Sequence, residues 1–344
     1  MKKLFIGFEK IKINRNIHES LDKKIFVEST STKKNETQFF KIDNFKSKKE
    51  LESSLLSFLN KTKIDLIIFN LIDDEISETT LLKIKNSYKT INWFGDDQWR
   101  FESFSRYKCW FFDYCITTDQ EALVKYKNIG YKNIILSQWG AVELNKNKIQ
   151  NYNFDISFIG SYSIAREWLI LKLRKNNLDV KVFGSGWGES TFLSFRDIEN
   201  VISSSRINLN LSNSAPKGLN MIWFFLGYFL KRPNKKNLVK LLKALKLKFL
   251  YEKNVEQIKA RNFEILAMNG FQLTNRVPQL NSYLKENQHL VFFDNDLDLV
   301  EKCKFYLENE HEREKIRKMG FLESQNHTYK KRFEEIFVKL DDFS

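Results

Sequence analysis

Short apolar runs alternate with polar, helix-like stretches along most of the chain, and this alternation restricts the fold more than any other sequence feature. Ile64 to Leu71 is a nearly continuous apolar run bounded by charge, which is typical of a strand buried on both faces. Just before it, Lys48 to Asn60 carries leucines at helical spacing, namely Leu51, Leu55, Leu56 and Leu59. Strands and helices in this order predict an α/β protein with a doubly wound parallel sheet.

The alternation restarts after a polar stretch, Glu143 to Asn153, which has the composition of a linker. We therefore predict two Rossmann-like domains, residues 1–145 and 154–325, and a closing helix within 326–344. A chain of 344 residues is long enough for two such domains. Ligands of open α/β sheets bind at the carboxyl ends of the strands, so we expect the functional site in a cleft between the domains.

Residues 214–255 interrupt the second series, and we interpret them as an insertion in the second domain. An apolar aromatic run, Met221 to Leu230, is followed by a basic stretch with five apolar residues on one helical face: Leu238, Leu241, Leu242, Leu245 and Phe249. Lys231 to Lys253 contains nine Lys or Arg and one Glu. Three interpretations stay open: a packed helical pair, a partner-binding surface, and an element (residues 221–253) that lies on an anionic membrane surface.

The charge balance favours anionic partners, because 57 Lys and Arg stand against 43 Asp and Glu, a formal net charge of +14. Such partners are nucleic acid, phosphorylated small molecules or acidic lipid. The three cysteines lack Cys-x-x-Cys spacing and fit a reducing compartment. No apolar run reaches the roughly 18 residues of a membrane span, and no signal peptide is visible. We expect a cytoplasmic protein, either free or peripheral at the inner face of the membrane.

Several common chemistries are missing from the sequence. It contains no P-loop, no G-x-G-x-x-G after the first strand and no G-x-S-x-G elbow. The four histidines are scattered without metal-ligand spacing. Asp294-Asn295-Asp296 has the form of a D-x-D metal motif, but it precedes a predicted helix, and helix capping explains it better. We expect no obligatory metal ion.

The stretch Ile258 to Asn275 is the strongest local signal. A charged loop opens a predicted helix, Gly270 ends it, and an apolar strand follows. Glu264 near the helix start suits ribose hydroxyls, and Arg261 suits a diphosphate because a guanidinium pairs with phosphate oxygens in a fork. Helix-start amides add to such an anion site. Spacing alone favours a helix N-terminus in which Glu264 only complements the helix dipole.

Two further motifs, in order along the chain, accompany this stretch. Phe158-Ile159-Gly160-Ser161 with Arg166-Glu167 comes before it, and His327-Thr328-Tyr329 with Arg332 comes after it. Together the three resemble the C-terminal lobe of the CgeB-like (spore maturation protein type) group 1 glycosyltransferases. The resemblance covers residues 155 to 337, with the insertion between, and the first domain carries weaker signals, chiefly Trp93 to Asp97.

The resemblance implies a GT-B architecture, in which two Rossmann-like domains face a cleft and the second holds a nucleotide-diphosphate sugar. It assigns the ribose contact to Glu264 and, through the E-x7-E spacing of the wider superfamily, a sugar contact to Glu256. The Gly-rich segment usual between these carboxylates is absent here. Gly160 and Ser161 follow a strand where a small residue lets backbone approach phosphate. Arg166 is either a second diphosphate ligand or a helix-surface cation.

Asp96 and Asp97 directly follow a predicted strand of the first domain. One of them is expected to orient or deprotonate the acceptor hydroxyl, and the alternative is a solvated turn. The resemblance thus implies a metal-independent, hexosyltransferase-like glycosyltransferase of cell-envelope polysaccharide synthesis. Its donor would be a nucleotide-diphosphate sugar, with no other cofactor, and its acceptor a glycan, a lipid-linked molecule or a protein.

Two other functional classes remain as alternatives, a basic nucleic-acid-binding protein and a non-catalytic scaffold. The positive charge is concentrated in the insertion and does not form a stripe with base-stacking aromatics, so we expect no nucleic-acid partner.

Overall fold

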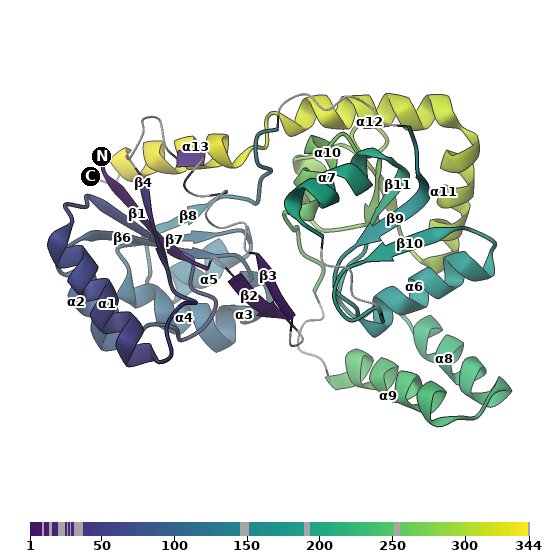
Figure 1. Cartoon of the computed structure of the whole chain (residues 1–344), viewed down its shortest axis with the longest axis horizontal. Helices are drawn as coiled ribbons and strands as arrows, with labels where there is room; N and C mark the ends of the chain where they lie inside the picture. The colour runs from purple at the N-terminus through teal and green to yellow at the C-terminus, as the bar shows by residue number, and fades with distance from the viewer. Residues whose placement is uncertain are drawn as a thin grey trace. The chain divides into compact units, whose positions relative to one another are not determined.

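The chain forms two compact units, Met1–Glu143 with His327–Ser344, and Leu144–Asn326. The structure, a computed structural model shown in Figure 1, describes residues 1–8, 37–144, 151–188, 193–250 and 255–342, with short pieces at 10–13, 16–19, 25, 27 and 29–30. The division between the units falls next to the stretch interpreted above as a linker. The apolar pattern also predicts a strand over Ile25 to Glu28, most of which lies outside the described residues.

The first unit contains a parallel six-stranded sheet in the order β4-β1-β5-β6-β7-β8. Its strands are β1 (Lys3–Gly7), β4 (Thr37–Lys41), β5 (Leu66–Phe69), β6 (Lys89–Phe94), β7 (Tyr114–Thr117) and β8 (Ile134–Leu136). A separate antiparallel pair consists of β2 (Lys10–Ile13) and β3 (Asn16–Glu19). The helices between the strands are α1 (Lys48–Lys61), α2 (Glu78–Lys85), α3 (Asp97–Arg100), α4 (Arg106–Lys108) and α5 (Ala122–Asn128).

Helix α1 illustrates how the predicted periodicity becomes packing. Ser47 caps its start by accepting a hydrogen bond from the Glu50 amide. The leucines Leu51, Leu55 and Leu59 are buried in one core cluster with the side chains of β1 and β5.

The last helix, α13 (Tyr329–Asp342), belongs to the first unit. The ring of Phe333 packs against Phe5 and Trp93, with centroids 6.2 and 5.9 Å apart. Before the helix, the His327 carbonyl accepts from the Ala141 amide, and the Ala141 carbonyl accepts from Tyr329, both at 2.9 Å. The tail motif singled out in the sequence therefore fastens α13 to the first unit.

The second unit contains a parallel five-stranded sheet in the order β10-β9-β11-β12-β13. Its strands are β9 (Phe154–Ile159), β10 (Val180–Phe183), β11 (Ser205–Asn210), β12 (Gln272–Asn275) and β13 (Val291–Phe293). Helices α6 (Ile164–Lys175) and α11 (Asp296–Glu308) contribute to its main core, and α7 (Phe195–Ser203) and α10 (Arg261–Ala267) share a smaller cluster. Helix α12 (Glu310–Ser324) packs against α10. Two doubly wound parallel sheets confirm the predicted α/β architecture.

The predicted insertion contains two helices, α8 (Asn220–Lys231) and α9 (Lys235–Leu250), which pack on each other and on α6. Figure 1 shows them as a pair that projects from the rest of the second unit. Met221 and Phe225 of α8 and Ala244 and Leu247 of α9 are buried in the main core. Burial of a large apolar side chain contributes roughly 1.5–3 kcal/mol, so one side of each helix is firmly anchored.

Candidate functional site

A pocket of about 340 Å³ lies at the carboxyl ends of β9, β11 and β12 in the second unit. We call it the cationic pocket, because Arg166, Lys259 and Arg261 all line it and Glu256 is the acidic residue among its lining. Gly160 and Ser161 of the loop after β9 also line it. The fold thus brings together five of the six residues predicted to bind the donor.

Arg166 braces two loops of the cationic pocket. Its guanidinium donates to the carbonyl of Ser161 at 2.7 Å and twice to the carbonyl of Leu211, at 3.0 and 3.1 Å. It also lies over the Phe158 ring, 5.3 Å from the centroid. These contacts fix the loops after β9 and β11 relative to each other, so Arg166 shapes the pocket as well as adding charge to it.

The loop after β9 is also fixed to the loop after β10. The Gly160 carbonyl accepts from the Trp187 indole at 2.8 Å, and the Tyr162 amide donates to Ser185 at 2.8 Å. Gly184 has φ +119°, and a Cβ there would lie 2.5 Å from the Gly160 oxygen. The glycine at 184 is therefore required for this close approach.

Arg261 and Glu264 form an ion pair on α10, with 3.3 Å between Nη1 and Oε2. Arg261 lines the cationic pocket, whereas Glu264 is 8% exposed and does not line it. The Glu264 carboxylate thus lies behind Arg261, seen from the pocket. Of the predicted donor-binding residues, Glu264 is the one that the structure does not bring to the pocket surface.

Glu256 is half-buried and lines both the cationic pocket and a second, adjoining pocket. Burial raises the pKa of its carboxyl, although the Ser212 hydroxyl and the charge of Lys217 act in the opposite direction. Its Oε2 is buried without a hydrogen-bond partner among the described residues. A buried carboxylate oxygen normally has a partner, so Glu256 is well placed to accept a hydrogen bond from a bound ligand.

The second pocket, of about 570 Å³, adjoins the cationic pocket at Glu256, Asn275 and Val277. We call it the apolar pocket, because most of its lining surface is apolar, with contributions from Trp168, Leu169, Val255, Pro278, Phe292 and Phe293. The Trp168 indole nitrogen is buried without a hydrogen-bond partner among the described residues. Asn275 joins the two pockets, and its side-chain oxygen accepts from the Ser212 amide at 2.6 Å.

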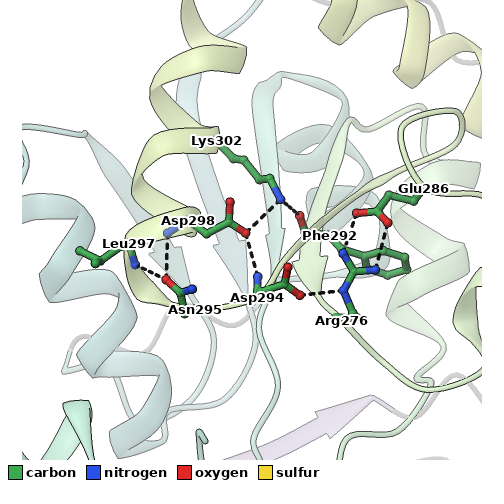
Figure 2. Close-up of polar contacts among 8 residues, drawn as sticks. All are labelled: Arg276, Glu286, Phe292, Asp294, Asn295, Leu297, Asp298 and Lys302. Carbon is green, nitrogen blue, oxygen red and sulfur yellow. Dashed lines mark hydrogen bonds and ion pairs between the residues drawn. The ribbon is translucent and has the colours of Figure 1, made fainter. Parts of the chain in front are cut away.

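Arg276 lines the apolar pocket together with Asp294 and Phe292, and Figure 2 shows the polar contacts of Arg276. The Arg276 guanidinium pairs with both oxygens of Glu286 at 2.8 and 2.9 Å and with Asp294 at 2.7 Å, while it lies over the Phe292 ring. The hydrogen bond from Arg276 lowers the pKa of Asp294. Two acidic groups therefore offset the guanidinium charge on this side of the pocket.

The Asp294-Asn295-Asp296 motif serves the start of α11. Asn295 caps the helix by accepting from the amides of Leu297 and Asp298, as Figure 2 also shows. Asp296 pairs with Lys172 at 2.8 Å. The capping interpretation of this motif is confirmed. Within the described ranges, no group of three His, Cys, Asp or Glu side chains is placed to hold a metal ion.

The two predicted acceptor-side carboxylates in the first unit differ in exposure. Asp97 is fully buried, and its carboxylate accepts from the Tyr126 hydroxyl at 3.1 Å. Burial raises its pKa to about 6, although hydrogen bonds from Ser105, Thr117 and Tyr126 act in the opposite direction. Asp96, at the start of α3, is half-buried. Asp96 is thus the more accessible of the two.

The raised pKa of Asp97 predicts how the stability of the first unit depends on pH. Between pH 3.8, the ordinary pKa, and about 6, the folded chain keeps a proton that the unfolded chain has lost. Stability should therefore fall by about 3 kcal/mol as pH rises through this window. We expect Asp97→Asn to remove this dependence in urea unfolding measured from pH 4 to 7. Asp65→Asn, at an exposed carboxyl, should keep the pH dependence of the free energy of unfolding. The same dependence in Asp97→Asn would contradict its assignment to Asp97.

Among the helices that the structure describes, none has the length and apolar character needed to span a bilayer.

Comparison with known proteins provides a family match for part of the chain. Residues 228–337 match the family described as "Glycosyl transferase-like". This segment includes α10 with Arg261 and Glu264, both helices after β13 and the start of α13. A search of curated proteins by sequence finds no match.

Solved structures provide a match for the fold of the whole chain. Anabaena Alr3699/HepE in complex with UDP and glucose has a TM-score of 0.57 and 13% identity, over 99% of this chain and 100% of that one. Sucrose-phosphate synthase from Thermosynechococcus elongatus has a TM-score of 0.57 and 8% identity, over 100% of both chains. The pneumococcal O-GlcNAc transferase GtfA, in complex with UDP and GlcNAc, has a TM-score of 0.53 and 11% identity. The match covers 87% of this chain and 60% of the GtfA chain.

The fold is therefore that of the GT-B class, with two parallel-sheet α/β units. Residues 228–337 are also similar to the glycosyl transferase-like family, in agreement with the class that the sequence predicts. The narrower resemblance to the CgeB-like group stays a prediction.

Proposed function

We propose that the chain is a glycosyltransferase whose second unit binds a nucleotide-diphosphate sugar and transfers the sugar to a hydroxyl acceptor. The observation that carries this proposal is the cationic pocket, with Arg166, Lys259 and Arg261 at the carboxyl ends of parallel strands. Cationic side chains that surround a diphosphate stabilise the charge that develops as the sugar leaves. No metal ion is needed in this proposal.

The diphosphate is placed in the cationic pocket, with Arg261 as its main ligand and Arg166 and Lys259 beside it. The guanidinium of Arg261 is about one quarter exposed, so it is within reach of a ligand in the pocket. Two of the structurally similar proteins, HepE and GtfA, were solved with UDP. We therefore place uridine diphosphate first in a panel of nucleoside diphosphates.

The transferred sugar is placed at the junction of the two pockets, next to Glu256. The cationic pocket suits the charged diphosphate, and the apolar pocket suits an uncharged sugar. There, sugar hydroxyls would donate to Glu256 Oε2 and the Asn275 amide, while C–H groups would contact Phe292 or Trp168. The excess of cationic side chains in the cationic pocket therefore supports one orientation of the donor.

The direct test of this function is turnover of a donor panel. We expect the full chain to release nucleoside diphosphate from one nucleotide sugar, slowly with water and faster with a hydroxyl acceptor, with or without EDTA. A non-catalytic scaffold would bind without release. No release from any donor in the panel, by a chain that is folded by circular dichroism, would contradict the enzymatic proposal.

The ribose of the donor is assigned to Glu264, as the resemblance implies. Because the carboxylate lies behind Arg261, the ribose hydroxyls must reach it beside the guanidinium. We expect Glu264→Ala to weaken binding of the preferred nucleoside diphosphate about tenfold. Removal of the ribose 2′-hydroxyl should weaken nucleotide binding to the wild type by a similar factor. The same removal should weaken binding to Glu264→Ala little further. If calorimetry shows that the loss from Glu264→Ala and the loss from the missing 2′-hydroxyl add, Glu264 only positions Arg261.

The acceptor is placed on the first unit, with Asp96 as the side chain that orients or deprotonates its hydroxyl and Asp97 as a buried support. A glycan, a lipid-linked molecule and a protein all remain acceptor classes in this proposal. We infer that the chain acts in the cytoplasm, in part at the inner face of the membrane, in the synthesis of cell-envelope polysaccharide. Asp96→Asn should reduce transfer and spare donor binding.

A further inference from the structure

The helical pair α8 and α9 exposes large apolar side chains on the side opposite its buried face. On α8, Trp223 is 62% exposed and Leu230 is 68% exposed. On α9, Leu242 is 55% exposed and Phe249 is 65% exposed. Trp223 and Leu230 are seven positions apart, as are Leu242 and Phe249, so each pair lies on one helical face. The two helices thus carry an exposed apolar stripe each, which we call the hairpin stripes.

The hairpin stripes lie within a strongly basic segment. Lys231 to Leu250 contains eight Lys or Arg and no Asp or Glu. Of these cations, Lys240 pairs with Glu167 at 2.6 Å. No acidic side chain among the described residues pairs with Lys235, Lys236 or Lys246, and all three are exposed. On α9, Lys235 and Lys246 follow the edge of the apolar stripe, because they lie close in helical angle to Leu242.

A groove of about 660 Å³ separates α9 from the loops after β9 and β10. Lys235, Lys236, Lys240 and Lys243 line one side of it, and Tyr162 and Trp187 line the other. Lys243 lies over the Tyr162 ring, 5.4 Å from the centroid. We call it the basic groove. Four cations along one groove, with a single carboxylate among its lining residues, Glu167, favour an anionic occupant.

We propose that α8 and α9 dock this protein on an anionic phospholipid surface. The hairpin stripes would enter the interface with Trp223 and Phe249, while the lysines of α9 would contact lipid phosphates, some of them at the basic groove. Amphipathic helices with lysine beside large apolar residues bind such interfaces, and each lysine near the surface adds electrostatic attraction. The anchored faces of both helices keep the stripes in place. This docking is independent of the transferase activity.

A lipid surface fits these residues better than a nucleic acid does. Single-stranded nucleic acid is bound by aromatic side chains that stack with successive bases along a basic track. Here, leucine and valine occupy most of the exposed apolar positions of α9, including Leu238, Val239, Leu242 and Leu250. These side chains offer no stacking surface, but they gain from burial in the acyl-chain boundary of a bilayer.

The helical hairpin that α8 and α9 form also adjoins the apolar pocket described above. Pro216, Lys217 and Asn220 at its start and Val255 after its end all line that pocket. Docking of the hairpin would therefore bring an apolar cavity close to the lipid. If the proposed transferase function also holds, a lipid-linked acceptor is the class that this placement favours.

Flotation of the full chain with vesicles tests the docking. We expect the protein to float with vesicles of phosphatidylcholine containing phosphatidylglycerol and to stay unbound with phosphatidylcholine alone. High salt should release it, since the lysine contacts are electrostatic. Equal flotation with both vesicles, or none with either, would overturn the proposal, as would stronger competition by single-stranded DNA than by anionic lipid.

Two variants and a matched control locate the surface. Trp223→Ser with Phe249→Ser, and separately Lys235→Gln with Lys236→Gln and Lys246→Gln, should each reduce flotation on the order of tenfold or more. Val124→Ser with Leu297→Ser replaces residues that are 61% and 65% exposed and should leave it unchanged. Equal flotation of all variants would overturn the proposal. Nucleotide binding, measured by calorimetry without lipid, separates this outcome from failure of the transferase proposal.

Discussion

Replacing Glu256 by glutamine is expected to reduce turnover about 100-fold while the affinity for nucleoside diphosphate stays nearly unchanged. Glu256 lies where the cationic and apolar pockets meet, and its buried Oε2 has no partner in the described part of the chain. A carboxylate there accepts hydrogen bonds from the transferred sugar, which the amide of glutamine does less strongly. The loss should therefore appear in kcat measured with saturating donor.

The pH dependence of turnover gives the Glu256 experiment a second readout. Burial raises the pKa of Glu256, and the ionised form is the acceptor, so activity should fall as pH decreases through that raised pKa. The acid limb of the profile should lie above the ordinary value of 4.5 and should be lost in Glu256→Gln. Glu75→Gln, a control at another carboxyl with a pKa raised by burial, should leave the limb in place. The same limb in Glu256→Gln would contradict the role.

Replacing Arg261 by alanine is expected to raise the Kd for the preferred nucleoside diphosphate about 30-fold. Its guanidinium lines the cationic pocket and has a single ion-pair partner, Glu264, among the described residues. A hydrogen bond between charged groups is worth about 2 kcal/mol, which corresponds to that factor. Calorimetry measures the change directly.

Two controls make the Arg261 prediction specific. Arg261→Lys keeps the charge but loses the forked geometry, so it should fall between the wild type and the alanine variant. Arg206→Ala removes an arginine of β11 that pairs with Asp155 and does not line the pocket, and it should bind like the wild type. Equal Kd values for wild type and Arg261→Ala would show that the diphosphate lies elsewhere.

The sequence predicts the fold well because the two parallel sheets depend on local patterns. Apolar runs such as Ile64 to Leu71 become buried strands, and the leucines of α1 become its core face. A strand buried on both faces and an amphipathic helix each leave a distinct period in the sequence. The fold could therefore be predicted without knowledge of long-range contacts.

The site is less predictable, because burial and contacts across loops leave no local pattern. The E-x7-E spacing treats Glu256 and Glu264 alike, yet the structure places Glu256 on the pocket surface and Glu264 behind Arg261. Similarly, the adjacent Asp96 and Asp97 differ in burial. Side-chain direction on a loop or helix decides such differences, and a motif does not encode it.

Other site residues give little sequence signal. Trp168 and Asn275 line the pockets only because α6 and the end of β12 come together in the fold. Arg276 gains its partners from Glu286 and Asp294, ten and eighteen residues further along the chain. The position of Asn275 at the carboxyl end of a predicted strand was the one available indication.

The central claim is that the cationic pocket binds the diphosphate of an activated sugar, and hydrogen–deuterium exchange of the full chain tests it most directly. With a saturating nucleoside diphosphate from the panel, we expect slower exchange in peptides that cover residues 157–161, 210–214 and 256–262. Protection confined to α9 and the basic groove, or no protection by any nucleotide in the panel, would contradict the claim.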